Sequence, residues 1–238
     1  EEALELLDFV KSKVAGRVKI VFGSGTNNTA TTIQLSQAAE KQGADGLLVV
    51  VPYYNKPPQS GLFLHFKAVA ESTSLPVMLY NVPGRTITSL NLATISQLQE
   101  IKNIVAIKEA TGDIDFGRQV ILAASKEFVV SSGDDESCLA LKRIGGQGVV
   151  SVCSHIMPTK MARWFSSETT DSDFRDFSGA IELIRSLYIT SNPIPVKAAL
   201  QMMGVIASDE MRLPLCTLEP EQKKTLEQAL KKYEGYLG

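Results

Sequence analysis

The 238-residue sequence contains little cysteine and histidine and no strong excess of charge of either sign. Its three cysteines, Cys138, Cys153 and Cys216, lie far apart and form no Cys-x-x-Cys pair, and only two histidines are present. These counts argue against a disulfide framework and a Cys/His zinc site, and they are typical of reduced thiols in the cytoplasm. Because 24 basic and 26 acidic residues give a net charge of −2, no basic excess indicates a nucleic acid or an anionic membrane as partner.

Long apolar runs and an opening secretory signal are also missing. The longest purely apolar run, Leu47–Pro52, is far too short to cross a bilayer. The composition is 44% hydrophobic and 21% charged, with 17 Gly and 10 Pro, which excludes disordered, collagen-like and coiled-coil chains. We therefore expect a globular, cytoplasmic protein.

Short β-branched runs alternate with amphipathic stretches along the first two-thirds of the chain. The stretches between the runs have apolar residues at spacings of three and four, which predict helices. A run begins about every 26 residues, as in repeated βα units. The predicted strands are Val18–Phe22, Leu47–Val51, Pro76–Asn81, Ile104–Lys108, Phe128–Ser132 and Gly148–Val152.

Regular βα alternation leaves a doubly wound open sheet or a (β/α)8 TIM barrel. The open sheet more often carries a glycine fingerprint at its first turn, and here Gly23-Ser24-Gly25 lacks the third glycine, so the barrel is favoured. Six of its eight βα units are visible. The chain opens in helical register, so we expect it to begin after a second strand, with two units missing. Residues 1–157 are predicted to form the barrel, and residues 158–238 a C-terminal helical domain.

Candidate chemistry lies where the strands end, because the active sites of such barrels are at that face. Lys108 ends one apolar strand and Tyr80 ends the strand before it, so both side chains are expected in the barrel mouth, with Glu109 on the opposite side. Burial lowers the pKa of a lysine, and its free amine can then form a Schiff base with a carbonyl. A phenol can shuttle the protons. From position alone, other roles remain open. Lys108 could instead pair with a carboxylate or bind a phosphate, and Tyr80 could be an interior tyrosine whose hydroxyl is hydrogen-bonded.

Nearby loops carry further candidates. Arg85 has a planar guanidinium group that suits binding of a substrate carboxylate. The alternative is that Arg85 is an ordinary loop arginine surrounded by solvent. Tyr53 and Tyr54 come shortly before two prolines, which predict a rigid loop. The two aromatic side chains could contact the active site, contact another subunit or simply pack against the rim of the barrel. His65 and His155 are isolated, and Trp164 is expected in a core or an interface.

Several motifs, in order and correctly spaced from about residue 18 to the C-terminus, resemble the bacterial dihydrodipicolinate synthases of the pyruvate-dependent aldolase superfamily. Each motif alone is weak, and together they are specific. They are Val51–Pro57, Tyr80–Thr86, Ile107–Gly112, Ser132–Asp135, Gly148–Val152, Asn192–Lys197 and Arg212–Pro214.

The resemblance implies a Schiff-base lyase on a (β/α)8 barrel with a C-terminal helical domain. It implies condensation of pyruvate with L-aspartate 4-semialdehyde to 4-hydroxy-tetrahydrodipicolinate in the lysine (diaminopimelate) pathway. It also implies a homotetramer built as a dimer of dimers, with no metal or cofactor and no nucleic-acid or membrane partner.

The resemblance also assigns roles to residues at matching positions. Lys108 is expected to form the pyruvate imine and Tyr80 to relay protons, joined by Tyr54 from the neighbouring subunit. Arg85 is expected to hold the carboxylate of the semialdehyde; the sialic acid lyases generally lack this arginine. The remaining assignments are Gly133 and Val150 as backbone contacts to pyruvate, and Asn27 and Tyr53 in a possible allosteric lysine site.

The sequence departs from the family at three places. The family's Gly-Thr-Thr-Gly-Glu loop is absent from these 238 residues. Thr31 stands where lysine-inhibited members often have glutamate, and His155 stands where asparagine is usual. The alternatives that remain are a related aldolase of the N-acetylneuraminate or 2-keto-3-deoxy sugar-acid type, or an inactive, truncated barrel.

Overall fold

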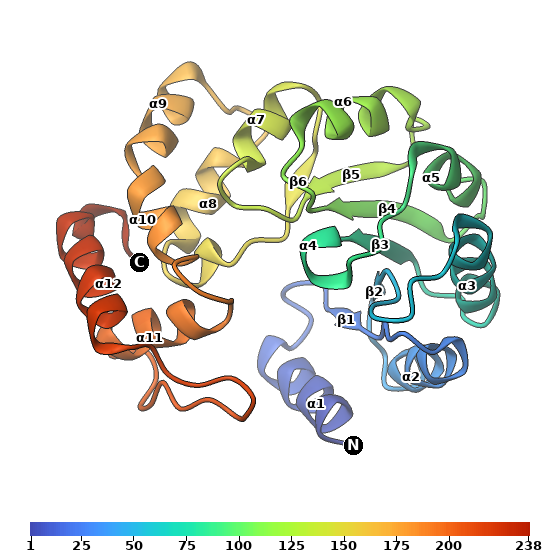
Figure 1. Cartoon of the computed structure of the whole chain (residues 1–238), viewed down its shortest axis with the longest axis horizontal. Helices are drawn as coiled ribbons and strands as arrows, with labels where there is room; N and C mark the ends of the chain where they lie inside the picture. The colour runs from blue at the N-terminus through green and yellow to red at the C-terminus, as the bar shows by residue number, and fades with distance from the viewer. The chain divides into compact units, whose positions relative to one another are not determined.

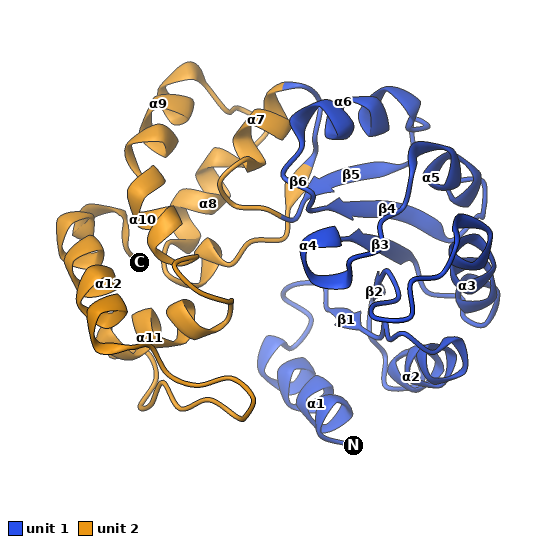
Figure 2. Ribbon diagram, viewed as in Figure 1, with its two compact units in different colours: residues 1–133, 144–147 blue, residues 134–143, 148–238 orange.

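The computed structural model describes residues 1–238 as helices and strands that form two compact units. The first unit comprises residues 1–133 and 144–147, and the second comprises residues 134–143 and 148–238 (Figure 2). No helix is long and apolar enough to cross a membrane. The boundary predicted after residue 157, between a barrel and a C-terminal helical domain, stays a prediction.

The first unit is built on a parallel sheet of five strands whose spatial order follows the sequence, β1-β2-β3-β4-β5. Each strand begins and ends within three residues of its predicted position. The strands are β1 (Val21–Gly23), β2 (Gly46–Val50), β3 (Val77–Asn81), β4 (Ile104–Glu109) and β5 (Val129–Ser132). The result is the α/β architecture expected from the βα alternation.

The longer helices between these strands lie along one face of the sheet (Figure 1). On that face Leu47, Val49, Leu79 and Ile107 are fully buried, and β3 alternates between buried and half-buried residues. The other face is less buried, and Leu48, Met78 and Lys108 on it are half-buried. The helices are α1 (Glu2–Val14), α2 (Thr29–Lys41), α3 (Gln59–Glu71), α4 (Pro83–Thr86), α5 (Leu92–Leu98) and α6 (Ile114–Ala123).

Capping residues set where several of these helices begin. Asn28 accepts from the Thr31 amide at the start of α2, and Asp113 accepts from two amides at the start of α6. Helix α5 is capped by Asn91, which accepts from the Thr94 amide.

The second unit contains the short strand β6 (Gly148–Val149) and is otherwise helical. Two of its helices, α9 (Asp171–Gly179) and α10 (Ile181–Ser186), are divided at Ala180. The helical segments are α7 (Cys138–Arg143), η1 (Cys153–His155), α8 (Pro158–Trp164), α9 (Asp171–Gly179), α10 (Ile181–Ser186), α11 (Ile194–Met202), α12 (Pro220–Lys232) and η2 (Glu234–Tyr236).

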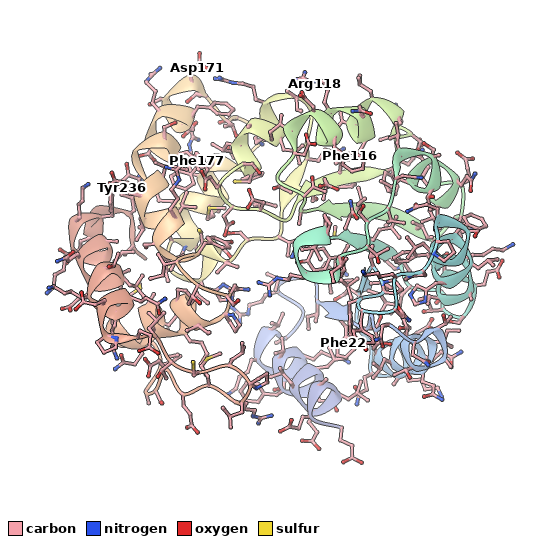
Figure 3. The ribbon with its side chains drawn as sticks, in the orientation of Figure 1. Phe22, Phe116, Arg118, Asp171, Phe177 and Tyr236 are labelled. Atoms are coloured by element: carbon pink, nitrogen blue, oxygen red, sulfur yellow. The ribbon has the colours of Figure 1, made fainter.

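The core of the second unit is organised around Trp164, which is fully buried. Its indole nitrogen donates to Asp176 at 3.0 Å. Its ring lies edge-on to Phe177 at 5.2 Å and 6.3 Å from Tyr236, both labelled in Figure 3. Trp164 therefore belongs to a core, one of the two places expected for it.

Candidate active site

Lys108 and Tyr80 occupy matching positions on neighbouring strands. The register of β3 and β4 pairs Tyr80 with Lys108 and Asn81 with Glu109. Because residues paired in a parallel sheet point to the same face, the amine and the phenol share the half-buried face, and Glu109 points to the opposite one. The predicted face of each side chain is confirmed, and the position of the pair in a barrel mouth stays a prediction.

The two side chains are in contact. The Lys108 ammonium nitrogen lies 4.0 Å from the centroid of the Tyr80 ring. This is within the distance at which a cation is attracted to an aromatic face. The sheet thus brings an amine and a phenol together at the carboxyl ends of two strands.

The phenol of Tyr80 is held in its protonated form. Burial raises the pKa of Tyr80, and the positive charge of Arg85 opposes that shift. A neutral phenol beside an amine can donate a proton and take it back, which is what general acid–base catalysis requires.

Arg85 belongs to α4, a single helical turn that starts two residues after β3 ends. The arginine is exposed, and its charge acts on Tyr80. The loop continues into Ile87, whose φ of 66° is unusual for a β-branched residue. Arg85 therefore supplies a positive charge close enough to Tyr80 to affect the pKa of its phenol.

Gly133 follows β5 and leaves room for the lysine. A Cβ at this position would lie 2.6 Å from Cε of Lys108 and 2.7 Å from the Ala110 methyl. Its amide donates to the Glu109 carbonyl at 2.7 Å. Any larger side chain at position 133 would displace Lys108. The space beside the lysine side chain therefore requires a glycine at this position.

The other predicted residues lie on separate loops. Tyr54 is 84% exposed with a φ of 73°, and Tyr53 is 40% exposed. Asn27 is half-buried, and its carbonyl accepts from the Asn55 side chain at 2.9 Å, which joins its loop to the tyrosine loop. Val150 follows β6 in the second unit and is 40% exposed.

Sequence reasoning missed one contact of His65. His65 is buried, and its Nδ1 lies 2.9 Å from the Thr29 hydroxyl, while its Nε2 has no partner. The side chain joins α3 to α2, and nothing in the spacing of single residues indicates that contact. No group of three or more His, Cys, Asp or Glu side chains gathers to hold a metal ion.

Comparison with known proteins gives one consistent relationship. The model of the dihydrodipicolinate synthetase family matches residues 1–233. The 4-hydroxy-tetrahydrodipicolinate synthase of Bdellovibrio bacteriovorus is 48% identical over 234 residues, which cover 97% of this chain and 80% of that protein.

Solved structures agree with the sequence comparison. The pyruvate complex of the chloride-inhibited dihydrodipicolinate synthase of Acinetobacter baumannii superposes with a TM-score of 0.95 at 40% identity, covering 99% of this chain and 81% of that one. The lysine-bound enzyme of Cyanidioschyzon merolae superposes with a TM-score of 0.91 at 39% identity, covering 97% and 79%.

Proposed function

Because this chain belongs to the dihydrodipicolinate synthetase family, we propose that it condenses pyruvate with L-aspartate 4-semialdehyde through an imine on Lys108. The enzyme is a lyase of lysine biosynthesis with the activity of a 4-hydroxy-tetrahydrodipicolinate synthase. The observation that carries the assignment to Lys108 is its 4.0 Å contact with the Tyr80 ring at the strand ends.

The first half of the reaction builds a nucleophile from pyruvate. The Lys108 amine adds to the keto carbon, and Tyr80 gives a proton to the oxygen, which leaves as water when the imine forms. Loss of a proton from the methyl group then yields an enamine, with the protonated imine nitrogen as the electron sink. This chemistry uses the protein's own amine and needs no metal or cofactor.

The second half joins the two substrates. The enamine carbon attacks the aldehyde of L-aspartate 4-semialdehyde, and the aldehyde oxygen takes up a proton. The amino group of that substrate then adds to the imine carbon and displaces Lys108, which closes the ring and regenerates the free amine. Arg85 is placed to bind the substrate carboxylate through its planar fork.

Other assignments complete the proposal. The backbones of Gly133 and Val150 contact pyruvate, and Tyr54 acts across the interface of a tight dimer. The active assembly is a tetramer of eight-stranded barrels in the cytoplasm. The structure of the A. baumannii relative contains pyruvate, which supports pyruvate as a substrate here. The exposure of Tyr54 supports its role, because a side chain 84% exposed on its own chain is available to a second one.

The lysine site is proposed at the loops of Asn27 and Tyr53. The hydrogen bond from Asn55 to the Asn27 carbonyl supports it, since it places the two loops next to each other. The structure of the C. merolae relative contains bound lysine.

Borohydride trapping tests the central step. The protein is reduced in the presence of pyruvate and digested, and peptide mass spectrometry locates the adduct. We expect one stable adduct on Lys108, none in Lys108→Arg, and full labelling in Lys102→Arg, which changes an exposed lysine before β4. An adduct on another lysine, or none in the wild-type protein, contradicts the proposal.

A further inference from the structure

Two polar residues lie directly behind the proposed catalytic pair. Asn81 follows Tyr80 and Glu109 follows Lys108, and the sheet register places them opposite each other. Their side chains are on the buried face, with 0% and 4% of their surface exposed. A carboxylate buried at this depth loses its hydration and needs hydrogen bonds to compensate.

Hydrogen bonds give a partner to each of the four polar atoms of the two side chains. The Asn81 amide nitrogen donates to Oε2 of Glu109 at 2.9 Å. The Leu90 amide donates to Oδ1 of Asn81 at 3.0 Å, and the Thr111 amide donates to Oε1 of Glu109 at 2.6 Å. Each carboxylate oxygen of Glu109 therefore accepts one of these bonds, and Asn81 is held in one orientation. Burial raises the pKa of Glu109, and the hydrogen bonds from Thr111 and Asn81 oppose that shift.

The bonds fix the two segments on which the proposed chemistry depends. The bond from Leu90 to Asn81 closes the nine-residue excursion that carries Arg85, and the bond from Thr111 to Glu109 closes the turn directly after Lys108. The backbone carbonyls of the same two residues accept from Ala110 and Gly133. Three consecutive strand ends are thereby tied together.

The Arg85 loop depends on this anchor. Its only helix, α4, is one turn long, and the loop then passes through the strained backbone of Ile87. Within the loop, the Thr86 hydroxyl lies within hydrogen-bond distance of the carbonyls of Val82 and Thr88. Asn81 supplies a side-chain bond that attaches the far end of the loop to the sheet.

We propose that Asn81 and Glu109 are a positioning pair that aligns Arg85 with the Lys108 amine, so that both reach the same bound aldehyde. This inference rests on the proposed function and adds two residues that do not touch substrate. Loosening the pair is expected to weaken binding of the semialdehyde more than formation of the pyruvate imine, because only the former uses Arg85.

An isosteric exchange of amide and carboxylate tests the pair. In Glu109→Gln, either Thr111, Asn81 or Leu90 loses its hydrogen-bond partner, since the glutamine offers one acceptor where the carboxylate offers two. In Asn81→Asp, two carboxylates face each other.

The double variant Asn81→Asp/Glu109→Gln exchanges the two functions and keeps the pattern of bonds. The new amide nitrogen at position 109 donates to the new carboxylate at position 81. That carboxylate still accepts from the Leu90 amide, and the amide oxygen at position 109 still accepts from the Thr111 amide. All three bonds therefore return in the double variant.

We expect each single variant to raise KM for L-aspartate 4-semialdehyde by about tenfold, from the loss of one buried hydrogen bond. The yield of the borohydride-trapped pyruvate adduct should stay within about twofold of wild type, and the double variant should recover KM to within about twofold. Glu40→Gln is the matched control, because Glu40 accepts from Thr73 and Ser74 at the other end of the first unit's helices, and its KM should not change.

A second measurement links the effect to Arg85. In an Arg85→Ala background, Glu109→Gln should have little further effect on KM, since both changes remove the same binding contribution. Independent, multiplicative effects would overturn the inference.

The remaining outcomes are decisive as well. Wild-type KM in the single variants overturns the inference, as does a raised KM in a double variant that circular dichroism shows to be folded. If the single variants fail to fold, the double variant alone decides, because it retains all three bonds. Absence of a pyruvate adduct in the wild-type enzyme instead refutes the proposed function, whatever the variants do.

Discussion

At the scale of single residues, the space around Lys108 is set by an absent side chain. We predict that Gly133→Ala lowers the initial rate of pyruvate imine formation by at least about tenfold, a loss of about 1.4 kcal/mol or more in transition-state stabilisation. The added methyl would lie 2.6 Å from Cε of Lys108 and 2.7 Å from the rigid Ala110 methyl, so the lysine side chain and the backbone at position 133 must both shift. Stopped-flow measurement of imine formation gives the rate.

Gly235→Ala is the control for this change, because a Cβ there meets nothing within 4 Å. It should leave the rate of imine formation unaltered. A Gly133→Ala enzyme with the wild-type rate would show that the lysine side chain adapts to the methyl without leaving its productive position.

Residue burial also predicts a pH dependence of stability. Burial lowers the pKa of His65 from 6.5 to about 4. Between these values the unfolded chain binds the proton and the folded chain does not, so the contribution of His65 is fully present above pH 6.5 and declines as the pH falls toward 4. The loss amounts to about 3 kcal/mol at most, at about 1.36 kcal/mol per pH unit.

Urea unfolding at a series of pH values measures this decline. We expect His65→Gln to reduce the slope of stability against pH in that window, while His155→Gln, at the exposed histidine, retains it. An unchanged slope in His65→Gln would remove His65 as its cause.

The identities of the catalytic candidates could be read from the sequence, but their surroundings could not. Lys108 and Tyr80 stand out because each ends an apolar strand, and period-two alternation correctly places Glu109 on the other side. The hydrogen bonds among Asn81, Glu109 and Leu90 depend on the register between two strands and on a loop closure. Neither follows from the spacing of residues along one segment.

At the scale of elements, helix starts depend on a single side chain. We predict that Asp113→Ala lowers the free energy of unfolding by about 1 kcal/mol, because Asp113 caps α6 by accepting from the amides of Asp115 and Phe116. Chemical denaturation measures the change. Asp113→Asn, which keeps an accepting oxygen, should lose much less, and equal losses in the two variants would show that the cap bond is not responsible.

The sequence predicted strands better than helix limits. Strand positions follow from apolar runs, which burial against helices requires. Helix limits depend on which of several nearby polar residues reaches a free amide, as when Asn91 rather than Ser89 caps α5. The turn α4 was missed because four residues are too few for a helical period, and the break at Ala180 because the apolar spacing continues across it.

At the scale of the whole molecule, each unit has a core of its own. We predict that Leu183→Ala, in the core of the second unit, lowers the free energy of unfolding by about 2–5 kcal/mol, as expected for a fully buried leucine. Calorimetry measures the loss. Leu213→Ala, at an 89% exposed leucine, is the control and should change stability by less than about 0.5 kcal/mol. Equal effects at both positions would contradict the assigned core.

The two parts of the proposed site are held by different means. The lysine and tyrosine are fixed by the backbone ladder of adjoining strands, whereas the arginine lies on an excursion anchored at residues 81 and 90. Grafting a different excursion between these two anchors could therefore redirect the enzyme to other aldehydes while it keeps its keto-acid chemistry. The fold thus separates imine formation on the strands from aldehyde recognition on the loop. This loop is therefore the natural place to begin engineering a new aldolase.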